Sequence, residues 1–214
     1  MSLVEKLKSM LRRRYFHLTA VLRKKSLNST NFTIISNNCW GGFVYQSYGI
    51  PYNSPTIGLF FMPDDYIKFV ANLKEYTSAE LTFINPESSA YYNIIKEEKS
   101  FGKFPVGKLN DIEIIFLHYR SEKEAYEKWT RRCERINWDK MLVKFNDQNG
   151  CTDEHITAFD KLDIKNKICF TAKKYNGLNS VIYIHTKAQD YVRSAQEPIG
   201  RSRYVNINKL LNSI

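Results

Sequence analysis

Short apolar runs rich in β-branched and aromatic residues alternate with amphipathic segments along most of this chain. The runs that predict strands are residues 32–35, 81–84, 112–119, 141–145, 167–171 and 180–185. Helical periodicity separates several of them, as in residues 63–73, 121–136 and 152–159. Such alternation predicts an α/β fold with a mostly parallel open sheet and helices on both faces. The closing stretch, 167–185, could add antiparallel edge strands near the C-terminus.

Length and composition are consistent with one packed core. The chain has 214 residues, 43% of them hydrophobic, which is enough for one domain with a substantial interior. Nine Gly and six Pro are too few for a collagen-like or disordered chain. We expect a basic N-terminal helix and connector over residues 1–30 and a single α/β domain over residues 31–214.

Positive charge is concentrated at the N-terminus. Residues 1–25 hold eight Lys or Arg and one acid, which gives them +7 of the formal charge of +10. Residues 3–22 also have helical periodicity, so this segment could lie on an anionic membrane surface. The alternative is a first helix docked on the body through its Leu stripe. The nearly balanced remainder makes a nucleic-acid-binding protein an unlikely class, unless the basic segment is a binding arm.

The cysteines and the hydropathy pattern favour a cytoplasmic protein. Cys39, Cys133, Cys151 and Cys169 are far apart and form no CxxC pair, so we expect no metal site. No secretory signal is evident, and no apolar run approaches the roughly 18 residues that span a bilayer. Any membrane contact would therefore be peripheral, on the inner face.

The turn after the first predicted strand is the first candidate site. Asn37 and Asn38 end the apolar run, and Gly41 and Gly42 allow backbone or ligand to approach closely. In open α/β sheets, ligands bind at the carboxyl ends of strands. The same sequence also suits a tight strand-to-helix turn with Asn as the helix cap.

Two further strand-end loops should lie on the same edge if the sheet is parallel. One begins at His118, a candidate general base, and the other contains Asp147, a candidate ligand for a hydroxyl group or a cation. Either residue could equally be a satisfied polar group at a strand end. Cys39 is a weak candidate for a nucleophile, because no histidine is near it in sequence.

A cationic stripe is predicted on the helix over residues 121–136. Lys128, Arg131, Arg132 and Arg135 recur at spacings of one, three and four residues. Arginine matches phosphate bidentately, so Arg131 and Arg135 could neutralise the phosphate groups of an activated donor. The alternative is a solvated helix face paired with nearby Glu residues.

Two motifs carry a resemblance to a known family. The sequences ISNNCWGG (35–42) and YNSPTIGLF (52–60), with looser segments up to about residue 175, resemble an uncharacterised bacterial family often labelled exopolysaccharide or capsule biosynthesis protein. The resemblance implies a role in surface-polysaccharide synthesis and transferase chemistry. It supplies no catalytic residue.

Our first hypothesis is therefore a transferase that modifies or extends a surface glycan. Its acceptor would be a carbohydrate or lipid-linked glycan, and its donor a nucleotide sugar or an acyl-CoA. The expected substrate-binding residues are Asn37, Asn38, Cys39, Trp40, Gly41, Gly42, Tyr45, Tyr52, Asn53, Arg131 and Arg135, with Trp40, Tyr45 and Tyr52 stacking on sugar. The expected catalytic residues are His118 and Asp147.

The second hypothesis is a non-catalytic carbohydrate-binding or assembly protein of the same pathway. A deep pocket with convergent His, Asp and Arg side chains would favour the enzyme. A shallow aromatic groove would favour the binding protein, whose aromatic side chains would bind carbohydrate and whose basic helix would recruit it to the membrane.

Overall fold

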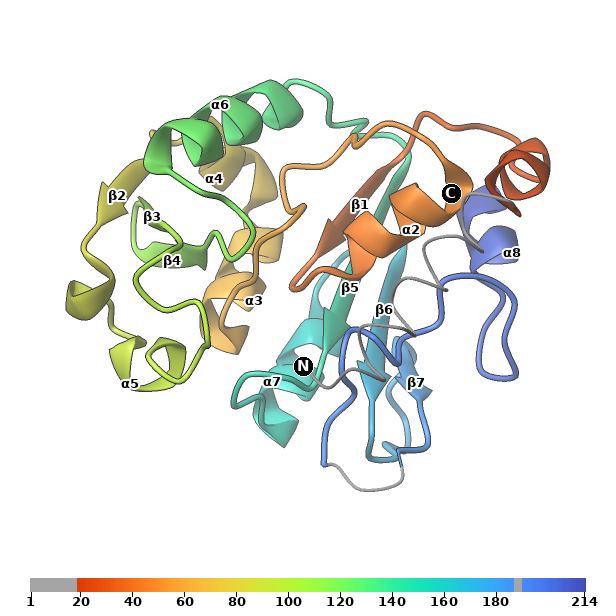
Figure 1. Ribbon diagram of the computed structural model, residues 1–214. Helices are drawn as coiled ribbons and strands as arrows, with labels where there is room; N and C mark the ends of the chain where they lie inside the picture. The colour runs from red at the N-terminus through yellow and green to blue at the C-terminus, as the bar shows by residue number, and fades with distance from the viewer. Residues whose placement is uncertain (1–18, 187–189) are drawn as a thin grey trace.

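The structure is a computed structural model that describes residues 19–186 and 190–214. Its centre is a four-stranded parallel sheet in the order β1-β5-β6-β7 (Figure 1). These strands are β1 (Thr33–Ser36), β5 (Met141–Asn146), β6 (Lys167–Thr171) and β7 (Val181–Tyr183). The predicted α/β class is confirmed.

Helices cover both faces of this sheet, as the sequence predicts. One face carries α2 (Trp40–Tyr48) and α8 (Ile207–Asn212), and the other carries α3 (Pro63–Ala71) and α7 (Asp153–Lys161). Successive strand residues point to opposite faces. Accordingly Ile34 and Phe170 pack with α2 and α8, whereas Ile35 and Phe145 pack with α3 and α7.

A second, smaller sheet is antiparallel and comes from the middle of the chain. Its strands, in spatial order, are β2 (Thr82–Ile84), β3 (Val106–Leu109) and β4 (Ile112–Ile115). Leu109 pairs with Ile112, so Asn110 and Asp111 alone form the turn between β3 and β4. Asn110 has a φ of 50°, the left-handed conformation that suits two-residue hairpin turns. This tight turn keeps the two strands adjacent and antiparallel.

Two predicted details of the sheet are therefore wrong. Within residues 112–119 only Ile112–Ile115 form a strand, and that strand joins the hairpin rather than the parallel sheet. At the other end, β7 pairs in parallel with β6, so the antiparallel strands lie mid-chain and not near the C-terminus. His118 consequently does not follow a strand of the parallel sheet.

Further helices complete the part of the molecule around the antiparallel sheet. They are α4 (Leu73–Ser78), the 3₁₀ turn η1 (Pro86–Ser88), α5 (Tyr92–Ile95) and α6 (Glu122–Cys133). One hydrophobic cluster joins both sheets, because Val143 of β5 and Ile114 of β4 belong to it together with Trp129 of α6. The two sheets therefore share a continuous core.

The predicted helix starts are confirmed where polar caps stand in the sequence. Ser121 accepts a hydrogen bond from the Glu124 backbone N–H at 3.2 Å, at the start of α6. Pro63 occupies the first turn of α3. Thr152 and His155 form a capping box at the start of α7. The His155 side chain accepts a hydrogen bond from the Thr152 backbone N–H at 3.0 Å.

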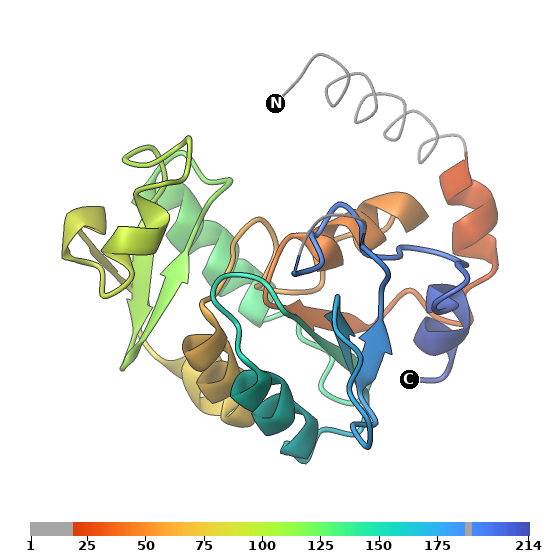
Figure 2. The same cartoon turned by 90° about the horizontal axis from the view of Figure 1, so that it is seen from below.

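The predicted basic helix over residues 3–22 falls mostly outside the described residues. Residues 19–25 are helical and lie beside α8 (Figure 2). The Ser26 carbonyl accepts hydrogen bonds from the side-chain amides of Asn208 at 3.1 Å and Asn212 at 2.9 Å. Within residues 19–186 and 190–214, no helix has the length and apolar character needed to cross a membrane.

Candidate functional site

The turn after β1 is built by its own polar side chains. Asn38 accepts a hydrogen bond from the Trp40 backbone N–H at 3.0 Å, and Ser36 donates its hydroxyl to the Asn38 carbonyl at 2.8 Å. These contacts turn the chain from β1 into α2 within three residues. Cys39 occupies the cap position of α2 but forms no side-chain cap bond.

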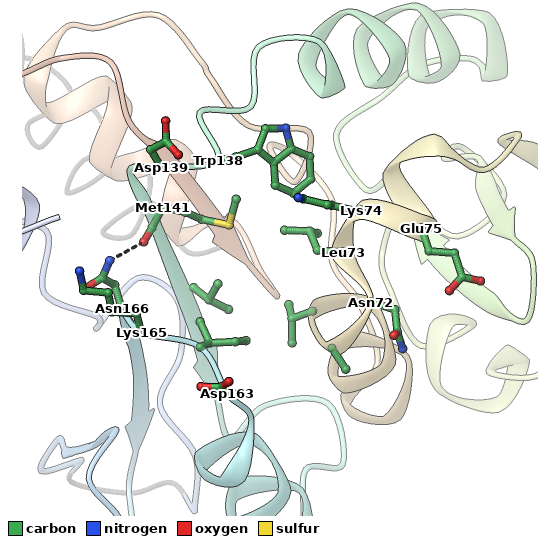
Figure 3. Close-up of a pocket in the computed structure, with 14 residues that line it drawn as sticks. Asn72, Leu73, Lys74, Glu75, Trp138, Asp139, Met141, Asp163, Lys165 and Asn166 are labelled. Carbon is green, nitrogen blue, oxygen red and sulfur yellow. Dashed lines mark hydrogen bonds between the residues drawn. The ribbon is translucent and has the colours of Figure 1, made fainter.

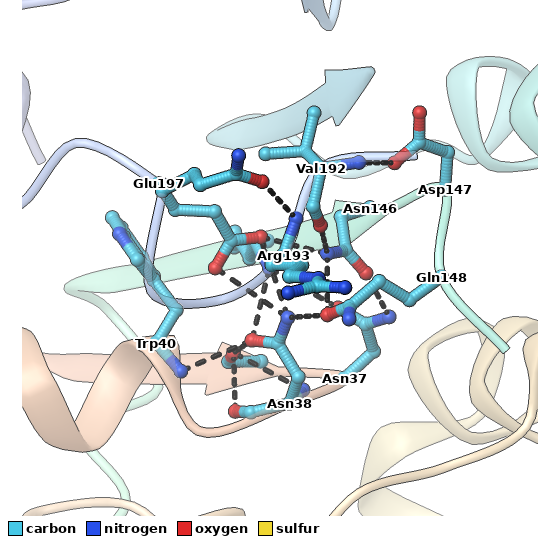
Figure 4. Close-up of polar contacts among 12 residues, drawn as sticks. Asn37, Asn38, Trp40, Asn146, Asp147, Gln148, Val192, Arg193 and Glu197 are labelled. Atoms are coloured by element: carbon cyan, nitrogen blue, oxygen red, sulfur yellow. Dashed lines mark hydrogen bonds and ion pairs between the residues drawn. The ribbon is translucent and has the colours of Figure 1, made fainter. Parts of the chain in front are cut away.

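The carboxyl ends of β1 and β5 meet as predicted, and a polar network joins them (Figure 4). The Asn37 side chain donates to that of Asn146 at 2.8 Å, and Asn38 donates to Gln148 at 3.0 Å. At the centre, the Lys144 ammonium group forms an ion pair with Glu197 and donates to Asn38 at 3.0 Å.

Both side chains of this ion pair are completely buried, with 0% of their surface exposed. Burial lowers the pKa of Lys144 and raises the pKa of Glu197. The opposite charge of its partner acts against this effect of burial on each residue. Asn146 also donates to the Glu197 carboxylate, at 2.8 Å. The amide side chains thus supply the hydrogen bonds that a buried charge pair requires.

A C-terminal segment, residues 190–199, fills this edge of the sheet. Asp147 accepts hydrogen bonds from the backbone N–H groups of Val192 at 2.7 Å and Ala172 at 2.6 Å. Trp40 donates its indole N–H to the Pro198 carbonyl at 2.6 Å. Both carboxylate oxygens of Asp147 therefore accept hydrogen bonds from backbone N–H groups. The crevice that was expected to bind a donor substrate is occupied by side chains of the protein itself.

The aromatic residues expected to stack on sugar are mainly structural. Trp40 and Tyr45 are completely buried, because α2 presses them against the sheet. Their rings contact Phe170 and Phe32, and the Tyr45 hydroxyl donates to the Phe32 carbonyl at 3.0 Å. This burial does not fit a role in stacking on a ligand.

The neighbouring residues of the motif are placed by packing as well. A side chain at Gly41 would meet Ile34 at 3.3 Å, so its absence allows α2 to lie close on β1. Tyr52 is partly exposed and accepts a hydrogen bond from Gln46, and the Asn53 carbonyl accepts from Thr33 at 2.9 Å.

The Cys39 thiol is poorly suited to nucleophilic attack. Burial, followed by the nearby Glu197 charge, raises the pKa of Cys39 to about 11. A nucleophilic cysteine requires the opposite shift. The expected place of Cys39 in substrate binding stays a prediction.

His118 lies exposed on the connection between β4 and α6. Its backbone N–H donates to the Gly58 carbonyl at 3.0 Å. Surrounding protein lowers the pKa of His118, while the Glu98 carboxylate opposes that shift. A neutral imidazole at physiological pH is the form a general base needs, so the predicted role remains open.

The cationic stripe on α6 is divided between surface and interior. Arg131 and Arg135 are exposed, as a solvated face would be. Arg132 is buried, and its guanidinium donates to the Tyr119 hydroxyl at 2.6 Å and the Ile57 carbonyl at 3.3 Å. Of these three arginines, only Arg132 is both buried and held by hydrogen bonds to described residues.

A groove of about 570 Å³ lies at the opposite end of the sheet (Figure 3). It runs between α3 and α4 on one side and the amino ends of β5 and β6 on the other. Its lining combines apolar Leu73 and Met141 with polar side chains that include Asn72, Asp139 and Asp163. Trp138 stands at this groove with 43% of its surface exposed.

The sequence did not predict this groove, because its candidate residues lie at the carboxyl ends of strands, in the segment that follows the first turn and on the helix over residues 121–136. The available signal was Trp138 itself. It follows α6 in the polar stretch Asn137–Lys140, where no helical or strand pattern gives an indole a core position. A tryptophan outside any amphipathic pattern is a candidate for ligand contact.

Comparison with known proteins identifies the family. The chain matches the family described as a domain of unknown function (DUF1919) over residues 10–210. The chain belongs to the DUF1919 family. It is also 37% identical over 181 residues to an uncharacterised protein of Haemophilus influenzae strain Rd, an alignment that covers 84% of this chain and 81% of that protein.

The DUF1919 match confirms the expected membership of a family without a described function. It spans the turn after β1, the buried ion pair and the Trp138 groove. Neither match carries the exopolysaccharide label that the resemblance implies.

Proposed function

We propose that this chain binds a glycan in the Trp138 groove and serves bacterial surface-polysaccharide synthesis as a carbohydrate-binding protein. The observation that carries the proposal is the exposed indole of Trp138 in a groove lined by both apolar and polar side chains. The sugar ring has an apolar face of C–H groups and an edge of hydroxyl groups. An indole can stack on the C–H face, while neighbouring carboxylates and amides form hydrogen bonds with the hydroxyl groups.

The polar groups of the groove suit hydroxyl groups. Asn72 and Asn166 can donate and accept, and Asp139 and Asp163 can accept. The Asn166 side chain is already held by a hydrogen bond to the Met141 carbonyl at 3.2 Å, which fixes its position in the groove. An apolar ligand would leave these groups without partners.

The charge of the groove selects against polyanions. Its ionisable side chains are Lys74, Lys165, Glu75, Asp139 and Asp163, which together carry a net charge of −1. The Lys74 ammonium group lies 5.5 Å from the centre of the Trp138 ring, a cation–π contact that orients both side chains. A neutral or amino-bearing glycan fits this balance better than nucleic acid or a phosphate-rich ligand.

A glycan array tests the proposal. The full chain should bind a subset of immobilised bacterial surface polysaccharides. Trp138→Ala should abolish that binding, whereas Tyr126→Ala should retain it. Tyr126 is the matched control because it is an exposed aromatic residue of α6 outside the groove. Equal binding by both variants would refute the groove assignment.

A second candidate is the transferase that the family resemblance implies. One observation favours it: His118 and Arg132 are both anchored on the connector between α2 and α3. The carbonyls that hold them belong to the adjacent residues Gly58 and Ile57. The backbone of a candidate base and the guanidinium of a cation are thus held at neighbouring residues, which could serve transfer from a phosphate-linked donor. Loss of surface glycan on His118→Ala, with retained folding, would support this candidate.

A further inference from the structure

Arg132 is a buried cation without an acidic partner. Only 7% of its surface is exposed, yet within the described residues no carboxylate forms an ion pair with it. Its two hydrogen bonds go to neutral oxygens, the Tyr119 hydroxyl and the Ile57 carbonyl. Buried charges in proteins are normally paired, so this arrangement leaves the positive charge uncompensated.

The guanidinium still has donors to offer. Both of its hydrogen bonds to described residues come from Nη1. An arginine carries five N–H groups, so those of Nε and Nη2 remain. Neither nitrogen donates a hydrogen bond to a described residue, so both can donate to a ligand.

The orientation of Arg132 is fixed before any ligand arrives. Its guanidinium carbon lies 5.2 Å from the centre of the Tyr52 ring, and Nη1 is tied to Tyr119. Stacking and hydrogen bonding together restrict the orientation of the planar, fork-shaped guanidinium group. A restricted fork loses little conformational entropy when it binds a planar or tetrahedral oxyanion in bidentate fashion.

A neighbouring ion pair on α6 leaves the charge of Arg132 unchanged. Lys128, one turn earlier on α6, lies 5.5 Å from the centre of the Tyr119 ring. The Glu124 carboxylate is paired with Lys128 and also accepts a hydrogen bond from the Arg120 backbone N–H. Glu124 therefore does not neutralise Arg132.

We propose that Arg132, with Tyr52 and Tyr119 beside it, binds a phosphate or diphosphate group. The ligand class is a diphosphate carried either by a nucleotide or by a polyprenyl lipid. This site differs from the Trp138 groove in charge and in lining residues, and the proposal stands whether or not the groove binds glycan.

Calorimetric titration of the full chain tests the site, with inorganic pyrophosphate, uridine diphosphate and polyprenyl diphosphate in detergent micelles as probes. Pyrophosphate should bind, and Arg132→Gln should weaken it by about tenfold or more. Lys123→Gln, which removes an exposed cation of the same helix, should leave the affinity within about twofold. Tighter binding of uridine diphosphate or of the lipid identifies the source of the phosphate.

A second measurement covers the case in which Arg132→Gln fails to fold. Phenylglyoxal modification of the unaltered chain, read by mass spectrometry, should be slowed by pyrophosphate at Arg132 and unchanged at the exposed Arg203. Absence of binding to all three probes would overturn the proposal. So would pyrophosphate binding that Arg132→Gln leaves intact, or protection that is equal at both arginines.

Discussion

Lys144 and Glu197 form an ion pair that no solvent reaches, and it links the central strand β5 to the segment over residues 190–199. The pair stands at the sheet edge where α/β proteins commonly bind ligands. Here the edge is closed by hydrogen bonds from Asn38 and Asn146 to Glu197. The pair therefore fixes the C-terminal part of the chain to the sheet.

Removing one partner of this pair should be costly. Lys144→Met leaves the Glu197 carboxylate buried without its cation, and we expect a loss of about 3–5 kcal/mol in the free energy of unfolding. The double variant Lys144→Met/Glu197→Leu should lose less, because neither charge remains buried. Urea denaturation measures both values.

The exposed pair Lys68–Asp111 is the matched control. Its side chains are 50% and 58% exposed, so solvent screens their attraction. Lys68→Met should change stability little. A double variant at Lys144 and Glu197 that is less stable than either single variant would contradict this account of the buried pair.

Two carboxyl groups predict opposite dependences of stability on pH. Burial raises the pKa of Asp65, so the folded state holds its proton longer and stability should fall as pH rises above about 4. The hydrogen bond from Lys68 lowers the pKa of Asp111, so its contribution should be present above about pH 4 and lost as pH falls. Urea titrations from about pH 3 to 7 give the slope of the free energy of unfolding against pH. Asp65→Asn and Asp111→Asn should change this slope in opposite senses. Equal slopes for both variants would contradict the assignment.

Gly107 is required by the packing of the antiparallel sheet. A Cβ at this position would lie 2.6 Å from the Phe116 ring and 2.8 Å from Leu81. Gly107→Ala should therefore cost about 1–3 kcal/mol through overpacking. Gly42→Ala, where the nearest atom would be Ile57 at 3.5 Å, should be neutral or stabilising because alanine favours a helix. Thermal unfolding compares the two, and similar melting temperatures would refute the packing argument.

Cys39 should behave as an unreactive thiol in the folded chain. With its pKa raised to about 11, Cys39 should react with iodoacetamide at neutral pH about a hundredfold or more slowly than an unperturbed cysteine. Peptide mass spectrometry after timed labelling measures the rate, and the urea-unfolded chain gives the reference. Fast labelling of Cys39 in the folded chain would reopen its role as a nucleophile.

The strands of the parallel sheet could be predicted because their apolar patterns are local. Residues 32–35, 141–145 and 167–171 have β-branched or aromatic side chains in runs that end at polar turns, and these runs became β1, β5 and β6. The hairpin was missed because its strand β3 contains Gly107 and Lys108 and reads as irregular. The turn at Asn110 and Asp111 was the decisive signal.

The polar network at the carboxyl ends of β1 and β5 was predicted only in part, because strand patterns do not show which distant segment packs against a strand end. The meeting of Asn37 and Asn38 with Asn146 and Gln148 follows from parallel pairing. The arrival of Glu197 does not, since it depends on a chain segment some fifty residues beyond Asn146. That long-range contact turned an expected ligand crevice into a closed polar core.

Binding of a glycan in the groove is the central claim, and titration of Trp138→Ala tests it most directly. The best polysaccharide fragment from an array would be titrated into the unaltered chain, Trp138→Ala and Tyr126→Ala, after thermal unfolding shows all three to be folded. We expect Trp138→Ala to bind about tenfold more weakly or not at all and Tyr126→Ala to bind as the unaltered chain does. Unchanged affinity in a folded Trp138→Ala chain would contradict the claim.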